Sequence, residues 1–136
     1  MNMKKIKNKV GRTYFVDDDE DKHIIDRLSN VPFQQRNLRF LRKCCPAKPI
    51  IVDAGMHIGE NTIEYSTWAK KVYGFEPCRA SYDLAVKNIL YNQEHWSKDK
   101  YWWYLNSRGS LNMTGEITTF NVGLDRKEHN LSLIHI

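Results

Sequence analysis

Two acidic side chains, Asp53 and Glu76, end two short apolar runs, and their spacing is the strongest chemical signal in this 136-residue sequence. Their positions differ by 23, about the length of one strand–helix–strand unit. Neighbouring strands of a parallel sheet end at the same edge, and the ligands of such sheets bind beyond that edge. We therefore expect both carboxylates to face one ligand, with Glu76 accepting hydrogen bonds from the two hydroxyls of a ribose.

A turn with two glycines, Gly55 and Gly59, follows Asp53 directly. Glycine lets the backbone approach a ligand at a point where a Cβ atom would clash. A dinucleotide site would instead have G-x-G-x-x-G after its first strand and a phosphate at the start of the next helix. A carboxylate at this point repels a pyrophosphate and attracts a ligand that carries an ammonium and a sulfonium group. The pattern therefore favours S-adenosylmethionine as the cofactor over NAD or ATP.

Three segments resemble the motifs of one known family, the FkbM family of S-adenosylmethionine-dependent methyltransferases. Residues 52–62 (VDAGMHIGENT) are similar to its first motif, D-x-G-A-N-x-G-x-x-T, although Met56 and His57 replace the usual Ala and Asn. The resemblance extends over about residues 50–130, apart from an insertion. Its other two segments are Phe75-Glu76-Pro77, followed by Tyr82, Asn88 and Asn92, and residues 121–125 (NVGLD).

The resemblance implies a role for each matching residue. Gly55 and Gly59 would form the turn under the amino-acid end of S-adenosylmethionine, and Asp53 would orient that end. Glu76 would bind the ribose, and Thr62 would contribute a hydroxyl. No catalytic residue is identified and no metal is expected. The implied activity is methyl transfer to an oxygen of a small molecule or saccharide.

Two other functions stay open: a nucleic-acid methyltransferase and a nucleoside-binding module without catalysis. The individual residues also have purely structural interpretations. Glu76 could cap the helix that follows it, and Asp53 could be a charge partner of a helix N-terminus. His57 in the turn is expected to pack or form hydrogen bonds rather than act as a base. Cys44 and Cys45 are expected to be buried apolar filler at a helix end.

Composition excludes several classes of protein and partner. The net charge of +5 is scattered along the chain, so a nucleic-acid partner is not expected. The basic residues before position 13 and the acidic run at 17–21 indicate a solvated, frayed N-terminal region. No apolar run is long enough to span a membrane, so no membrane partner is expected. Three cysteines without metal-site spacing fit a cytoplasmic protein with reduced thiols.

The strands and helices that are predicted around Asp53 and Glu76 indicate an α/β fold. We expect an incomplete, Rossmann-like sheet of the class I methyltransferase type, with its first three parallel strands at 49–53, 71–76 and 117–122. The first strand is apolar enough to be buried on both faces. Helices are predicted at 60–69 and from Pro77 onward, the latter with one face formed by Tyr82, Ala85, Val86, Ile89 and Leu90.

The region before the sheet is predicted to be an N-terminal cap spanning residues 1–48. It would contain a strand at 9–16, a short helix at 23–28 and a helix at 33–45. Leu38, Leu41 and Cys45 have the spacing of one buried stripe on that last helix.

Residues 49–130 would form the N-terminal half of the S-adenosylmethionine-binding domain. The aromatic and basic segment at 95–104 is expected to be an insertion that covers the sheet edge or packs locally, with stacking on bases or sugars as the alternative. The family resemblance implies further strands, so we expect a fragment that is inactive alone. Residues 131–136 (LSLIHI) are the peptide that a common sequencing adaptor encodes, and we expect a non-native tail there.

Overall fold

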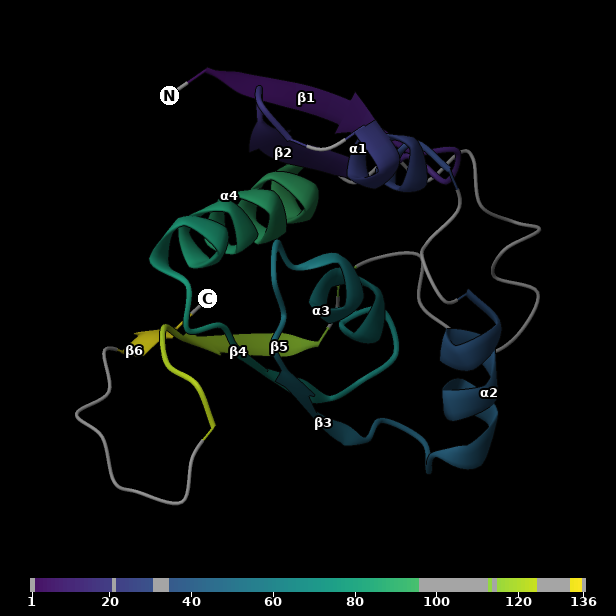
Figure 1. Ribbon diagram of the computed structural model, residues 1–136. Coiled ribbons are helices and arrows are strands. Elements are labelled where there is room, and N and C mark those ends of the chain that lie inside the picture. Colours follow the sequence, from purple (N-terminus) through teal and green to yellow (C-terminus); the bar gives the residue numbers. More distant parts are fainter. Residues whose placement is uncertain are drawn as a thin grey trace.

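The computed structural model describes residues 2–20, 22–30, 35–95, 113, 115–124 and 133–135 (Figure 1). After an N-terminal hairpin and two helices, strands and helices alternate between residues 50 and 120, and a further strand follows. The elements in order are β1 (Met3–Lys7), β2 (Thr13–Asp17), α1 (Lys22–Leu28), α2 (Gln35–Cys44), β3 (Ile50–Ala54), α3 (Glu60–Tyr65), β4 (Lys71–Phe75), α4 (Arg79–Glu94), β5 (Glu116–Phe120) and β6 (Leu133–His135).

The central sheet has the strand order β3-β4-β5-β6. The first three strands are parallel, and each is paired with the next over its full length. The last, β6, pairs antiparallel with the end of β5. The prediction of an α/β fold with three parallel strands is confirmed. Each of the first two strands is followed by a helix that returns the chain to the edge where the strands begin.

Helices α3 and α4 cover one face of this sheet (Figure 1). Val72 and Ile117 are neighbours in adjacent strands and are fully buried on that face. Ile63 of α3 and Ile89 of α4 belong to the same buried cluster. The face of α4 was predicted correctly in its main part, because Tyr82, Ala85 and Ile89 are buried, whereas Leu90 is exposed.

The opposite face of the sheet corrects one prediction. The first strand was expected to be buried on both faces, but Ile50 is 64% exposed and Val52 is 58% exposed. In the described part of the chain, the helices packed on this sheet lie on its other face (Figure 1). The exposed face also carries Phe75 and Phe120, whose rings stack with centroids 4.6 Å apart.

The N-terminal region corrects a second prediction, because it is folded rather than frayed. β1 and β2 form an antiparallel hairpin, and β2 packs against α4 (Figure 1). Tyr14 and Val16 are buried in the main core, and Arg12 of the basic run is fully buried as well. The strand predicted at 9–16 begins later, at Thr13, because residues before it form a turn in which Gly11 has a φ of 79°.

Helix α2 corrects a third prediction. A short helix at 23–28 and a longer one within 33–45 are confirmed as α1 and α2. On α2, however, only Leu38 of the expected stripe is buried, while Leu41 is exposed. Cys44 is exposed and Cys45 is half-buried, so the expectation that both are buried filler was wrong.

Two expectations fall on residues outside the described ranges. These are the aromatic and basic segment after His95 and the helical residues before Gln35. Within the described ranges, no helix is both long and apolar enough to cross a membrane.

Candidate functional site

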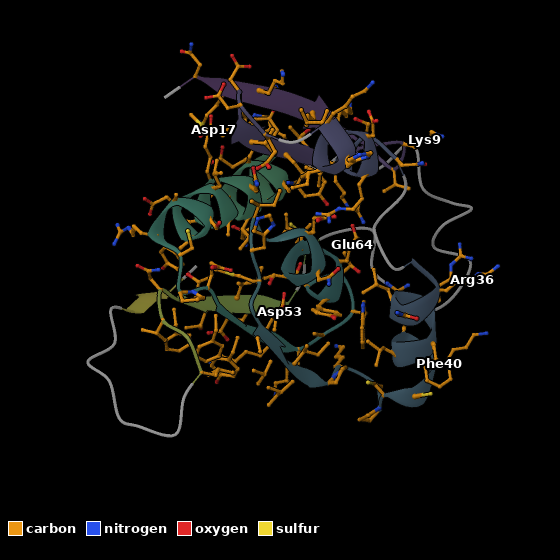
Figure 2. All side chains as sticks on the ribbon, in the orientation of Figure 1. Lys9, Asp17, Arg36, Phe40, Asp53 and Glu64 are labelled. Carbon is orange, nitrogen blue, oxygen red and sulfur yellow. The ribbon has the colours of Figure 1, made fainter. Side chains whose placement is uncertain are left out.

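The structure places the two predicted carboxylates at the same edge of the sheet. Asp53 is the fourth residue of β3, and Glu76 directly follows β4. Because these strands are adjacent and parallel, with Asp53 opposite Gly74, both residues lie at the carboxyl end of the sheet. Figure 2 shows Asp53 between β3 and α3, on the face that the helices cover.

The turn between β3 and α3 has a left-handed backbone at three of its residues. Gly55, His57 and Gly59 all have positive φ, at 80°, 51° and 90°. A Cβ on Gly59 would lie 3.4 Å from the Ala85 carbonyl oxygen, so both its φ and the closeness of α4 favour glycine. A Cβ on Gly55 would meet no atom within 4 Å, so its φ alone accounts for the residue.

Glu76 holds this turn against the end of β4. Its Oε2 accepts a hydrogen bond from the His57 backbone N–H at 2.9 Å, and its Oε1 accepts one from the Cys78 N–H at 2.8 Å. Cys78 is the N-cap residue directly before α4, so the capping interpretation of Glu76 is correct in part. The side chain is buried, and each carboxylate oxygen keeps a second lone pair for another donor.

Asp53 is a buried carboxylate that accepts a hydrogen bond from a side-chain hydroxyl. Thr62 Oγ1 of α3 donates to Asp53 Oδ2 at 2.6 Å, and Thr62 is fully buried. Burial raises the pKa of the Asp53 carboxyl above its usual value, and the hydrogen bond from Thr62 partly offsets that shift. Among the described residues, no cation forms an ion pair with Asp53. A cationic or hydroxyl-bearing ligand would suit this carboxylate.

The five predicted site residues therefore belong to one connected structure. Glu76 bonds the turn that contains Gly55 and Gly59, and Asp53 bonds the helix that follows this turn. Thr62 contacts Asp53, so the threonine positions a carboxylate in addition to offering an oxygen of its own. Among the described residues, no group of three or more potential metal ligands gathers.

Sequence reasoning left one neighbouring residue without a role. Asn88 of α4 is fully buried and donates from Nδ2 to the Ile58 carbonyl, inside the turn, at 3.0 Å. The same side chain accepts from the Phe15 N–H of β2 at 2.6 Å and donates to the Phe15 carbonyl at 3.2 Å. The Asn88 side chain thus forms hydrogen bonds with the hairpin, as the backbone of an adjacent strand would, and a further hydrogen bond with the turn. The sequence feature that could have identified this residue is an asparagine on the buried face of a predicted helix.

We expect Asp53→Asn to stabilise the fold at neutral pH. The pKa of the Asp53 carboxyl is raised in the folded state, so ionisation of this group destabilises the fold. The neutral carboxyl contributes its full stability below the pKa that it has in the unfolded chain. This contribution is lost as pH rises through the pKa that it has in the folded chain. Asparagine stays neutral and keeps an oxygen for the Thr62 hydroxyl. The gain should be on the order of 1 kcal/mol at pH 7.5 and should vanish near pH 3, measured by urea unfolding.

The matched control is Asp26→Asn, which removes an exposed carboxylate on α1 and should change stability little at either pH. If Asp53→Asn were no more stable than the unmodified chain at pH 7.5, burial of this carboxylate would not be a cost to the fold.

Comparison with known proteins adds no family to this description: the chain matches no protein-family model and no curated protein. The function proposed below is therefore based on the geometry of the residues at the carboxyl end of the parallel strands.

Proposed function

We propose that this chain carries the S-adenosylmethionine-binding part of a class I methyltransferase of the FkbM type, acting on an oxygen of a small molecule or saccharide. The observation that supports the proposal most is the position of Glu76. It is a buried acceptor at the end of the second parallel strand, and backbone N–H groups on two sides hold both of its oxygens. This arrangement prepares a carboxylate for a pair of vicinal hydroxyls.

The other site residues suit the remaining parts of the same ligand. Asp53 offers a buried negative charge to an ammonium group, and its ionised form would gain an ion pair that the described chain does not provide. The left-handed turn at 55–59 would let backbone atoms lie against the amino-acid end of the ligand. Thr62 would orient Asp53 through the hydrogen bond between them.

In this proposal the bound cofactor supplies a methyl group activated by its sulfonium. The residues of this chain bind and orient that cofactor and do not take part in the chemical step. Catalysis of this kind depends largely on positioning, since holding the methyl group in line with the acceptor oxygen lowers the barrier. No residue of the described chain is assigned as the base that removes the proton from the acceptor.

Calorimetry with S-adenosylhomocysteine tests the proposal. The unmodified chain should bind it, and Glu76→Gln should weaken binding by about 2–4 kcal/mol, because glutamine lacks the charge and has one carbonyl oxygen in place of two acceptors. Glu94→Gln, which changes an exposed glutamate at the end of α4, is the matched control and should bind normally. Circular dichroism should verify that both variants are folded. A folded Glu76→Gln protein with undiminished affinity would contradict the proposal.

A further inference from the structure

The end of β5 lies beside the residues that connect β4 to α4 (Figure 1). The backbone pairing of β4 with β5 ends at Phe75 and Phe120. Glu76 follows directly, and its N–H donates to the Phe120 carbonyl oxygen at 3.0 Å. The next donor from β5 is a side chain: Asn121 Nδ2 donates to the Glu76 carbonyl oxygen at 2.9 Å and to the Pro77 carbonyl oxygen at 3.2 Å. One amide group thus binds two successive carbonyls at this junction.

These hydrogen bonds complete a set that fixes Glu76 at every polar group. Its two carboxylate oxygens accept from the backbone N–H groups of His57 and Cys78. Its backbone N–H and carbonyl are held from the side of β5, by Phe120 and Asn121. Of these four partners, Asn121 is the one that bonds through its side chain. A substitution can therefore remove it while the other three contacts keep their chemical groups.

The junction needs such a donor because Pro77 ends the regular ladder. Proline has no backbone N–H, so it cannot continue the pairing with β5. The half-buried Asn121 amide satisfies two carbonyls that a longer strand or water would otherwise have to satisfy. The segment after it lies along the same residue, since a Cβ on Gly123 would be 3.7 Å from Pro77 Cβ. Asn121 thus fixes the peptide group between Glu76 and Pro77, from which the Glu76 side chain projects.

We propose that Asn121 is a positioning residue for the recognition of a ribonucleoside. By fixing the backbone of Glu76, it would hold the carboxylate where both oxygens accept hydrogen bonds from the 2′ and 3′ hydroxyls. This inference rests on the proposed function and adds that the site selects a ligand with both hydroxyls present. Hydrogen bonds are directional, so two vicinal hydroxyls require two oxygens in fixed positions, whereas attraction of a cation does not.

A comparison of two nucleosides measures this selectivity on the intact chain. Adenosine carries both ribose hydroxyls, and 2′,3′-dideoxyadenosine carries neither. In NMR titrations the unmodified chain should bind adenosine at least about tenfold more tightly, because each hydrogen bond to a charged group contributes to the difference. Glu76→Gln should reduce this ratio, since it removes the charge that accepts the hydroxyls.

The variants Asn121→Ala and Asn121→Leu test the positioning residue itself. Both lack the amide donor, and leucine keeps the number and branching of the side-chain heavy atoms. We expect both variants to be folded by circular dichroism. Each should bring the two affinities to within about threefold of each other, while the affinity for 2′,3′-dideoxyadenosine changes less than about twofold. Asn2→Ala and Asn2→Leu, at an exposed asparagine in the N-terminal region, are the matched controls and should keep the original ratio.

The ratio separates positioning from a purely structural role. An Asn121 variant that bound both nucleosides more weakly by the same factor, or that kept the original ratio, would overturn the inference. If Glu76→Gln still removed the selectivity in that case, the proposed function would stand without Asn121. If the unmodified chain bound both nucleosides equally, Glu76 would not bind the ribose, and the proposed function and this inference would fail together.

Discussion

Replacement of Arg12 by methionine is expected to lower the free energy of unfolding by about 3–5 kcal/mol. Arg12 and Glu64 form a buried ion pair whose side chains are only 1% and 3% exposed. Arg12 Nε donates to Glu64 Oε1 at 2.7 Å, and Arg12 Nη2 donates to Oε2 at 3.3 Å. Methionine fills much of the same space but leaves a buried carboxylate without its cation, and urea unfolding followed by circular dichroism measures the cost.

The double variant Arg12→Met/Glu64→Leu separates the ion pair from the packing around it. Replacing both charges by apolar side chains should restore most of the lost stability, because no buried charge then stays unpaired. Arg79→Met is the matched surface control: it breaks an exposed ion pair with Asp83 on α4 and should cost less than about 1 kcal/mol. If Arg12→Met cost no more than Arg79→Met, the buried pair would not hold the hairpin to α3.

This ion pair also explains why the N-terminal region was predicted incorrectly. Arg12 belongs to a run of basic residues that reads as a solvated segment. Its burial depends on Glu64, which is 52 positions away in the chain, and local composition carries no information about that contact. The same holds for Tyr14, whose burial requires the hairpin to lie on the core.

The parallel sheet and its carboxylates could be predicted because their signals are local. A short β-branched run followed by a glycine turn predicts a strand that ends at Asp53, and a second short apolar run, before Pro77, predicts one that ends at Glu76. The exposure of Ile50 and Val52 could not be predicted in this way. An apolar strand has the same sequence whether one face or both faces are covered, and the difference depends on which other elements pack there.

The misassigned stripe on α2 has a geometric cause. Helical spacing groups Leu38 and Leu41 on one side, but it does not determine which member of the group points at the core. The helix is rotated so that Leu38 and Arg42 face inward, since Arg42 bonds Thr67. Leu41 therefore lies at the margin of the contact, where it is exposed. A cation at the inner side of a helix is not visible to a pattern based on apolar residues.

Replacement of Asn88 by leucine is expected to destabilise the fold by at least about 3 kcal/mol. Leucine has the same number and branching of side-chain heavy atoms as asparagine, so the change replaces hydrogen-bonding groups by bulkier methyl groups on a similar skeleton. It leaves the Phe15 N–H and two carbonyls, those of Phe15 and Ile58, without this partner. Each buried group that loses its partner costs about 1–3 kcal/mol. Gln93→Leu, at an exposed position on the same helix, is the control and should be nearly neutral.

Hydrogen exchange can show whether Asn88 also determines the geometry of the turn. Its amide bonds β2 on one side and the Ile58 carbonyl on the other, so loss of the side chain should release both segments together. The Phe15 amide should exchange faster, and so should the amide of Gly59, whose N–H donates to the Met56 carbonyl within the turn. If only Phe15 responded, the hairpin would be attached to α4 without influence on the turn. If both responded, the N-terminal hairpin would be part of what positions the backbone next to Asp53 and Glu76.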